Sequence, residues 1–213
     1  MRLDAVIFAD GPPFPKSLNA RLRRGRFTIV LDGAAEAVRK QGWLPHMVAG
    51  DFDDVSPSTL RYFEKKGVAI LHTPDQDFTD LEKAIAWCVL RDCESIWIAQ
   101  AFGGRVDHSF VNLSLLKRFH SPVRELVLFQ ENERVRFLRN QKIKLGGRQS
   151  RRLAVLPFPK CTVRSKGLNF EMRGMPLELG AKESASNSAR LKDVTLDVEG
   201  EALVVEEISG GKK

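Results

Sequence analysis

The fold of this chain is decided by two acidic motifs, Gly50-Asp51-Phe52-Asp53-Asp54 and Asp75-Gln76-Asp77-Phe78-Thr79-Asp80, with one predicted helix and one predicted strand between them. Residues 46–49 before the first motif have the short, continuous apolar pattern of a buried strand. Asp51 and Asp53 follow it and can lie on the same side, about 7 Å apart, if the chain stays extended. Carboxylates this close repel each other unless a cation lies between them, and a set of oxygen ligands suits a hard ion such as magnesium.

The second motif opens a helix whose start is predicted by capping chemistry. Thr79 is a good N-cap, and Glu82 three residues later completes a capping box. Asp80 and Lys83 share one face of this helix, apart from the apolar face formed by Leu81, Ala84, Ile85, Cys88 and Val89. The positive helix end favours the charge of Asp80 and could also receive a phosphate or a metal-bound phosphate. The alternative interpretation is that these acids are only caps and turn formers.

Short apolar strands alternate with helices through the first part of the chain, which predicts an α/β fold with a mostly parallel sheet covered on both faces. The expected strands are residues 3–9, 27–31, 46–49, 68–71 and 95–99. In such sheets, ligands bind at the carboxyl ends of the strands. Six carboxylates follow strands in this way: Asp32, Asp51, Asp53, Asp75, Asp77 and Asp80.

Two further motifs suggest contacts with a nucleotide. Asp32-Gly33 follows a strand directly, and Asp32 could accept from a ribose hydroxyl or simply cap the next helix. In the segment 102–108, Gly103 and Gly104 expose backbone amides, and Arg105 offers a fork of donors that matches phosphate oxygens. In the same segment, Asp107 is equally an N-cap or a catalytic group, while His108 is more readily interpreted as structural than as a phosphate contact. The chain contains no GxxxxGK[ST] or GxGxxG motif.

From about residue 131 the pattern changes to short strands separated by turns, which predicts a small antiparallel β-sandwich. The expected strands are residues 134–138, 153–158, 162–164, 194–198 and 202–206, and the segments 166–170 and 184–188 are expected to be polar loops. We therefore expect domains at residues 1–130 and 131–213. The tail at residues 210–213 is expected to be disordered.

The composition indicates a protein with a real core, because 43% of the 213 residues are hydrophobic and 29% are charged. Asp4 interrupts the first apolar stretch and no apolar run is long enough to span a bilayer, so we expect a soluble, cytoplasmic protein. The three cysteines form no CxxC pair, so neither disulfides nor zinc are implied. Much of the net charge of +7 lies in a basic stripe, which suits a solvated face or an anionic small substrate better than nucleic acid. The stripe consists of Arg134, Arg136, Arg139, Lys142, Lys144, Arg148, Arg151 and Arg152.

Four motifs, in this order and spacing, resemble those of the thiamine pyrophosphokinase family. They are Asp32-Gly33, Gly50-Asp51-Phe52-Asp53, Asp75-Gln76-Asp77-Phe78-Thr79-Asp80 with Lys83-Ala84, and Gly103-Gly104-Arg105-Val106-Asp107-His108. Lys166-Gly167-Leu168-Asn169-Phe170 and Ser186-Asn187 resemble the second domain of the family. The likeness covers nearly the whole chain, and the four motifs together are highly specific.

The resemblance implies a nucleotide-binding α/β domain and a thiamine-binding β-sandwich, in a homodimer whose active sites lie at the subunit interface. The implied reaction converts ATP and thiamine into AMP and thiamine diphosphate. Magnesium on the triphosphate would be held by Asp51, Asp53 and Asp80, with Asp75 and Asp77 nearby. ATP would be placed by Asp32, Gly33, Lys83, Gly103, Gly104, Arg105 and Asp107. Gln76 would contact the aminopyrimidine, and Phe170, Ser186 and Asn187 would come from the second subunit.

The implied catalysis depends mainly on positioning the two substrates and on stabilising charge in the transition state. Attack of the thiamine hydroxyl on the β-phosphorus builds charge on phosphate oxygens, which the metal and Arg105 can stabilise. Either Asp80 or Asp51 could take the hydroxyl proton, so the expected catalytic residues are Asp51, Asp53, Asp80 and Arg105. The chain departs from the family pattern at Phe170, where tryptophan is common, at Ala185-Ser186, and at Asp54, where serine is usual.

Two other functions are compatible with parts of the sequence. A strand followed by Asp51-Phe52-Asp53 also resembles an aspartate-nucleophile phosphohydrolase, which would release inorganic phosphate and leave the other motifs unexplained. A non-enzymatic nucleotide or RNA binder could use the basic stripe, and its binding would depend steeply on salt.

Overall fold

The computed structural model describes residues 3–208, so the tail predicted to be disordered lies outside the described residues. The chain divides into two compact units, Met1–Glu131 and Asn132–Lys213. None of the helices within residues 3–208 combines the length and the apolar composition that crossing a membrane would require.

The first unit contains a parallel sheet with the order β6-β5-β1-β2-β3-β4. Its strands are β1 (Asp4–Phe8), β2 (Phe27–Leu31), β3 (Met47–Gly50), β4 (Ala69–His72), β5 (Ser95–Ala99) and β6 (Glu125–Gln130). Every neighbouring pair in this sheet is parallel, as the alternating pattern predicts. From β1 the chain adds strands on one side as far as β4 and then on the other side with β5 and β6. The crevice that binds ligands in such sheets is therefore expected beside the carboxyl ends of β1 and β5.

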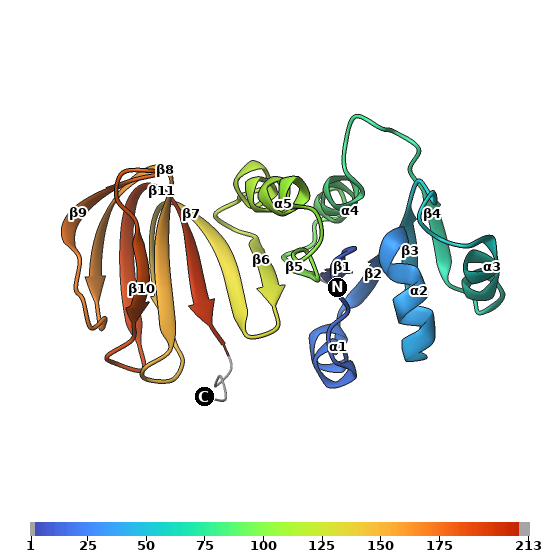
Figure 1. Ribbon diagram of the computed structural model, residues 1–213, viewed down its shortest axis with the longest axis horizontal. Helices are drawn as coiled ribbons and strands as arrows, with labels where there is room; N and C mark the ends of the chain where they lie inside the picture. Colours follow the sequence, from blue (N-terminus) through green and yellow to red (C-terminus); the bar gives the residue numbers. More distant parts are fainter. Residues whose placement is uncertain (1–2, 209–213) are drawn as a thin grey trace. The chain divides into compact units, whose positions relative to one another are not determined.

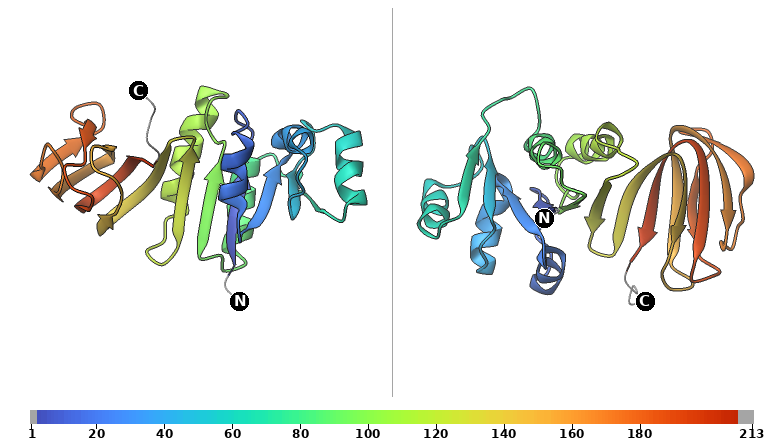
Figure 2. Two further views of the ribbon diagram at one scale, coloured as in Figure 1. Left: turned by 90° about the horizontal axis from the view of Figure 1, so that it is seen from below. Right: turned by 180° about the vertical axis from the view of Figure 1, so that it is seen from behind.

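Helices cover both faces of this sheet. They are α1 (Lys16–Arg23), α2 (Asp32–Gln41), α3 (Pro57–Lys65), α4 (Asp80–Val89) and α5 (Val106–Arg118). α4 and α5 lie on one face, and α1 and α2 lie on the other (Figures 1 and 2). The strands β1, β2 and β3 are almost wholly buried, which explains their continuous apolar sequences.

The N-cap predicted at Thr79 is confirmed, and a second helix has an N-cap of the same kind. Ser56 caps α3 by accepting from the Thr59 N–H, with Pro57 at the first helical position, and Thr79 caps α4 by accepting from the Glu82 N–H. The Glu82 carboxylate itself pairs with Arg118 on α5. The caps fix where each helix begins, and they thereby place Asp80 in the first turn of α4.

The second unit is an antiparallel sheet with the order β10-β8-β11-β7, and β9 pairs with another part of β8. Its strands are β7 (Glu133–Leu145), β8 (Arg152–Lys166), β9 (Arg173–Glu178), β10 (Ser184–Ser188) and β11 (Val194–Glu207). Among the described residues of this unit, fifteen buried side chains form the core, including Val155, Val163, Leu168 and Leu196. The whole chain thus has a mixed α/β fold.

The strand boundaries predicted in this unit were partly wrong. The segments expected at 153–158 and 162–164 form the single strand β8, and those at 194–198 and 202–206 form β11. Gly200, between the two segments predicted as separate strands, lies at a register shift in the continuous pairing of β8 and β11. Its φ is +92°, and a Cβ there would lie 2.6 Å from the Lys160 carbonyl oxygen. It is therefore a bulge residue, and the ladder continues on both sides. Residues 184–188, expected to be a loop, form the strand β10.

Candidate functional site

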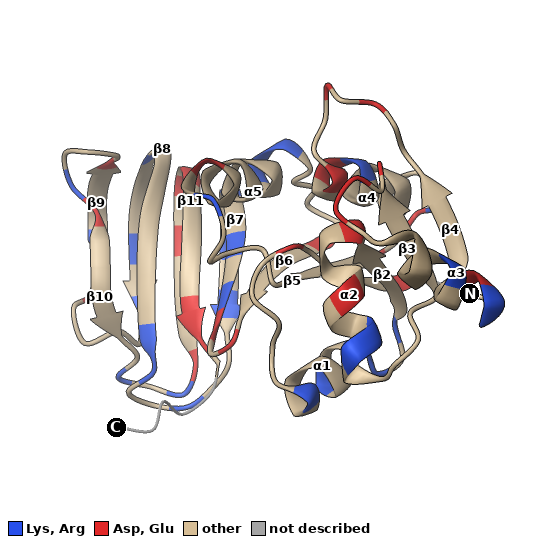
Figure 3. Cartoon of the chain, turned by 45° about the vertical axis from the view of Figure 1, so that its right-hand side comes forward, with Lys and Arg blue, Asp and Glu red and all other residues tan. Residues whose placement is uncertain are grey.

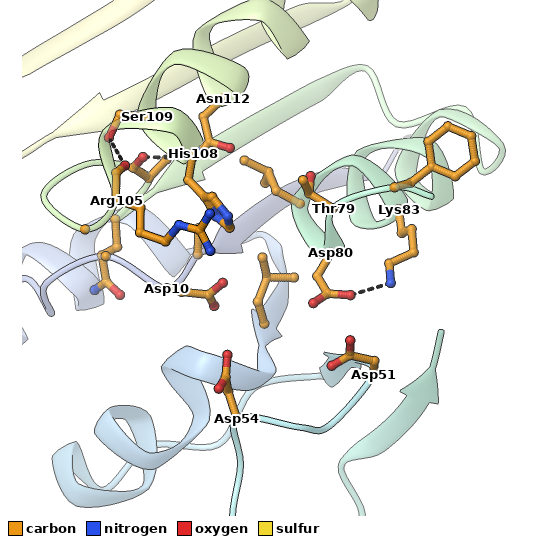
Figure 4. A pocket seen from close by; sticks show the side chains of 18 of the residues that line it. Asp10, Asp51, Asp54, Thr79, Asp80, Lys83, Arg105, His108, Ser109 and Asn112 are labelled. Atoms are coloured by element: carbon orange, nitrogen blue, oxygen red, sulfur yellow. Dashed lines mark hydrogen bonds and ion pairs between the residues drawn. The ribbon is translucent and has the colours of Figure 1, made fainter. Parts of the chain in front are cut away.

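A cavity of about 710 Å³ opens at the carboxyl ends of the strands of the first unit. Segments that follow β1, β3 and β5 line it together with the start of α4 and the first turn of α5 (Figure 4). It lies beside the ends of β1 and β5, where the order of the sheet places the crevice. Most of the acidic residues singled out from the sequence surround this one space.

Asp32, Asp51 and Asp80 converge in this region from α2, the end of β3 and α4 respectively. Each offers a carboxylate oxygen, and the three oxygens lie within 4.8 Å of one another. Such a set of hard oxygen ligands fits a divalent cation such as Mg²⁺. Asp53, Asp75 and Asp77, which were also predicted to be metal ligands, are not part of this group in residues 3–208. Asp53 and Asp77 line the cavity, and Asp75 accepts from the Asp77 N–H at 2.9 Å on the adjoining turn.

Asp32 is the most buried of these carboxylates, with a relative exposure of 2%. Its Oδ1 accepts from the Gly33 N–H and its Oδ2 accepts from the Phe52 N–H, both at 2.9 Å. Burial, followed by the charge of Asp80, raises the pKa of Asp32 to about 6. Asp32 therefore holds the turn of the first acidic motif, and a cation beside it would favour its charged form.

Two glycines allow the backbone to approach these carboxylates. A Cβ on Gly50 would lie 2.6 Å from Asp32 Cγ, and a Cβ on Gly33 would lie 2.9 Å from Asp10 Cγ. Real Cβ atoms do not approach other atoms this closely, so any larger residue at either position would displace a carboxylate. The glycines of the two motifs are thus required by the packing of the site.

Asp51 is held by the second acidic motif. Gln76 Nε2 donates to Asp51 Oδ2 at 2.9 Å, and the Asp53 N–H donates to Asp51 Oδ1 at 3.2 Å. These two hydrogen bonds lower the pKa of Asp51, with the Gln76 contact having the larger effect. Gln76, predicted to contact the substrate, is therefore already in place at the edge of the cluster.

Asp10 is a cavity residue that was not among the predicted site residues. It follows β1, and its carboxylate faces Asp54 and Asp80 across the cavity (Figure 4). Desolvation of its carboxyl group, followed by the charges of Asp32 and Asp80, raises its pKa to about 7. The signal that could have identified it is its place directly after a buried strand, which it shares with Asp32 and Asp51.

Lys83 connects the segment between β4 and α4 to the first turn of α4. Its Nζ lies 2.6 Å from Asp80 Oδ1 and donates to the carbonyl oxygens of Thr73 at 2.6 Å and Asp75 at 3.0 Å. The predicted pairing of Asp80 with Lys83 on one helical face is thus confirmed. Lys83 is the only lysine that lines the cavity within the described residues.

The glycine-rich segment before α5 forms another wall of the cavity. Arg105 donates to both carboxylate oxygens of Asp107, from Nη2 at 2.5 Å and from Nε at 3.1 Å, and this pairing lowers the pKa of Asp107 to about 2. Asp107 is not the N-cap of α5, because Arg105 occupies that position and Asp107 is the second helical residue. His108 is exposed and lines the cavity, so the structural role favoured for it was wrong. Gly104 lines the cavity as well, while Gly103 turns the chain with a φ of +91°.

The predicted thiamine-binding residues Phe170, Ser186 and Asn187 belong to the second unit, and they lie close together there. The Asn187 side chain hydrogen-bonds the backbone of Phe170, whose ring is 75% exposed. Ser186 has a φ of +60° in the strand β10. Phe170 and Ser186 are thus exposed, and they lie next to the buried Asn187.

The basic stripe is largely neutralised within the second unit. Arg139 pairs with Glu201 at 2.8 Å and Arg148 pairs with Glu207 at 2.7 Å, so cations of β7 and its following turn meet carboxylates of β11. Lys144 pairs with Asp193, and Arg134 and Arg151 both pair with Glu206. The carboxylates can be seen on β11 next to the cations of β7 (Figure 3). The stripe is thus mainly a set of ion pairs between neighbouring segments.

Comparison with known proteins gives one consistent result. Residues 18–128, just over half of the chain, match the family model described as thiamin pyrophosphokinase, catalytic domain. Thiamin pyrophosphokinase 1 of Caenorhabditis elegans is 27% identical over 207 residues, which cover 89% of this chain and 83% of that protein. The crystal structure of thiamine pyrophosphokinase from Bacillus subtilis superposes with a TM-score of 0.86 at 20% identity, covering 97% of this chain and 100% of that one. Thiamin pyrophosphokinase from Candida albicans gives a TM-score of 0.86 at 17% identity over 97% of this chain and 90% of that one.

Proposed function

The chain belongs to the thiamin pyrophosphokinase family, and from this premise we propose that it transfers the pyrophosphoryl group of ATP to the hydroxyl group of thiamine. The products are AMP and thiamine diphosphate. The observation that carries the proposal is the convergence of Asp32, Asp51 and Asp80 at a cavity beside the carboxyl ends of the strands. Family membership does not favour a phosphohydrolase or a polynucleotide-binding protein.

We propose that Asp32, Asp51 and Asp80 hold Mg²⁺ carried on the phosphates of ATP. When bound, the ion would offset the charge of the polyphosphate and polarise its phosphorus–oxygen bonds. Asp53 and Asp77 line the same cavity, and we assign them, with Asp75, to outer positions that reach the ion through water. Asp32 was expected to bind the nucleotide, whereas this proposal assigns it to the metal ion.

Other residues of the cavity would place the two substrates. The guanidinium of Arg105 retains N–H donors beyond the two that Asp107 uses, and these suit phosphate oxygens. The backbone amides near Gly103 and Gly104 suit the same group. The hydrogen bond to Asp51 fixes the amide of Gln76, whose carbonyl oxygen would accept from the amino group of the aminopyrimidine. Catalysis would then depend on bringing the hydroxyl in line with the β-phosphorus.

We further propose a cytoplasmic homodimer, in which residues 1–130 bind ATP and a β-sandwich of residues 131–213 supplies Phe170, Ser186 and Asn187 to the site of the other subunit. A mixture of Asp51→Asn and Asn187→Ala subunits tests this arrangement. If each site uses both chains, mixed dimers contain one intact site and recover activity that neither variant has alone. No recovery would argue against a shared site.

A product assay tests the activity itself. Purified protein with ATP, Mg²⁺ and thiamine should form AMP and thiamine diphosphate in equal amounts, measured by chromatography. A phosphohydrolase would release inorganic phosphate without needing thiamine. Related alcohols offered in place of thiamine would show whether the departures at Phe170 and Ala185-Ser186 alter the choice of acceptor.

A further inference from the structure

The ammonium group of Lys83 makes two hydrogen bonds and one ion pair inside the first unit. Three oxygens surround Nζ, namely Asp80 Oδ1 at 2.6 Å, the Thr73 carbonyl at 2.6 Å and the Asp75 carbonyl at 3.0 Å. An ammonium group has three donors and no acceptor. The side chain is only 13% exposed. A phosphate oxygen that approached Nζ would therefore compete with these three oxygens for the ammonium group.

The three partners come from different parts of the site. Thr73 follows β4, Asp75 begins the second acidic motif, and Asp80 is the first residue of α4. The turn between them carries Gln76 and has exposed side chains throughout residues 74–78. Such a turn has little apolar burial to hold it, so its position depends on polar contacts of this kind. Lys83 thus fixes the turn to the helix that presents Asp80.

We infer that Lys83 is a positioning residue for the acceptor side of the cavity and does not bind the phosphates of the nucleotide. It sets where Gln76 lies relative to Asp80, and its charge reduces the repulsion between Asp80 and the neighbouring carboxylates. The acceptor is thiamine only if the proposed function holds, but the position of the turn can be measured without any acceptor.

The inference is tested with Lys83→Met, which removes the ammonium group and keeps the length of the side chain. Lys65→Met, at an exposed lysine in the last turn of α3, is the matched control. Hydrogen exchange in the ligand-free protein should accelerate at the Thr73 and Asp77 amides, which donate to Gly50 O and Asp75 Oδ1 in the wild type. In turnover assays the KM for thiamine should rise about tenfold or more, because Gln76 is no longer held in place.

Binding of a non-hydrolysable ATP analogue with Mg²⁺ separates the two roles. A lost charge-assisted hydrogen bond to phosphate would weaken binding by about tenfold or more. We expect a change below about fivefold; a larger loss overturns the inference, and so does unchanged exchange at Thr73 and Asp77. If wild-type protein makes no thiamine diphosphate, the proposed function fails. The exchange and analogue measurements would still show whether Lys83 holds the turn or binds phosphate.

A second variant guards against a general folding defect. Lys83→Cys, alkylated with 2-bromoethylamine, restores an ammonium group at nearly the original position. Cys88, Cys93 and Cys161 are all buried, so the introduced thiol is the accessible target among the described residues. Alkylation should return amide exchange and the KM for thiamine toward wild-type values. Failure of a correctly folded, alkylated protein to recover slow exchange would contradict the inference.

Discussion

The side-chain amide of Asn187 bonds both backbone polar groups of Phe170. Its Oδ1 accepts from the Phe170 N–H at 3.2 Å, and its Nδ2 donates to the Phe170 carbonyl at 2.8 Å. Asn187 is 4% exposed, whereas Phe170 is 75% exposed. A buried amide thus holds the backbone of a residue whose ring faces solvent. Asn187 was predicted to bind substrate, and we propose that it acts by holding Phe170 in position.

Replacing Asn187 with alanine should destabilise the protein. The change leaves both backbone groups of Phe170 without their partner, and such losses cost about 1–3 kcal/mol. Urea unfolding followed by tryptophan fluorescence or circular dichroism measures the difference. Asn169→Ala is the control, because exposed Asn169 makes one side-chain hydrogen bond, to Ser188 Oγ at 2.8 Å. Equal losses in the two variants would show that the paired contact to Phe170 adds nothing.

Asp51→Asn should weaken cation binding more than Asp53→Asn does. Asp51 contributes an oxygen to the group formed with Asp32 and Asp80, whereas Asp53 lines the cavity outside this group. Loss of a direct ligand is expected to lower turnover by about a hundredfold or more with the fold intact. Mn²⁺ binding by calorimetry and AMP formation are the two measurements. An Asp53→Asn effect equal to or larger than that of Asp51→Asn would reverse the assignment of inner and outer positions.

Asp10→Asn should stabilise the metal-free protein at pH 8. The pKa of Asp10 is raised from 3.8 to about 7 in the folded protein, so the folded state binds a proton more tightly than the unfolded state. Stability from this group is therefore present below pH 3.8 and is lost as the pH rises toward 7. Thermal unfolding in EDTA should show a higher Tm for the variant at pH 8, with the gap closing toward pH 4. Asp92→Asn, on an exposed turn far along the chain, serves as the control.

Mg²⁺ should reduce the loss of stability that the charge of Asp10 causes at pH 8. A divalent cation beside Asp10 favours the charged carboxylate, and it therefore lowers the free-energy cost of holding that charge in the folded protein. The Tm gap between wild type and Asp10→Asn at pH 8 should therefore narrow when saturating Mg²⁺ replaces EDTA. A gap that does not depend on pH or on Mg²⁺ would mean that the raised pKa has no bearing on stability.

The parts of the fold that the sequence predicted correctly are those governed by local chemistry. Thr79 caps its helix by accepting from the Glu82 N–H three residues on, and the carboxyl ends of parallel strands necessarily meet at one edge of a sheet. Asp10 was missed because its importance comes from Asp32 and Asp80, which only the folded sheet brings near it. Residues 194–198 and 202–206 were predicted as separate strands because the sequence does not show that their pairing continues past Gly200.

The last prediction concerns the buried ion pair Arg151–Glu206 of the second unit. The burial of an ion pair should affect the stability lost on breaking it more than the distance between its charged atoms does. Arg151 Nε lies 3.2 Å from Glu206 Oε1, and both side chains are nearly inaccessible, at 1% and 2%. The pair Arg164–Glu199 is closer, at 2.7 Å, but its side chains are 56% and 65% exposed. Arg151→Met leaves a buried carboxylate with fewer partners and frees the carbonyls of Leu145, Arg148 and Lys192 that Arg151 now bonds.

We expect Arg151→Met to cost about 3–5 kcal/mol, as breaking a buried pair does. Arg164→Met should cost about 1 kcal/mol or less, because water screens an exposed pair. Urea unfolding of both variants measures the two costs. Similar losses would mean that the shorter distance of the exposed pair compensates for its exposure. Because Arg134 also pairs with Glu206, at 2.7 Å, the loss in Arg151→Met should grow when Arg134→Met is added to it.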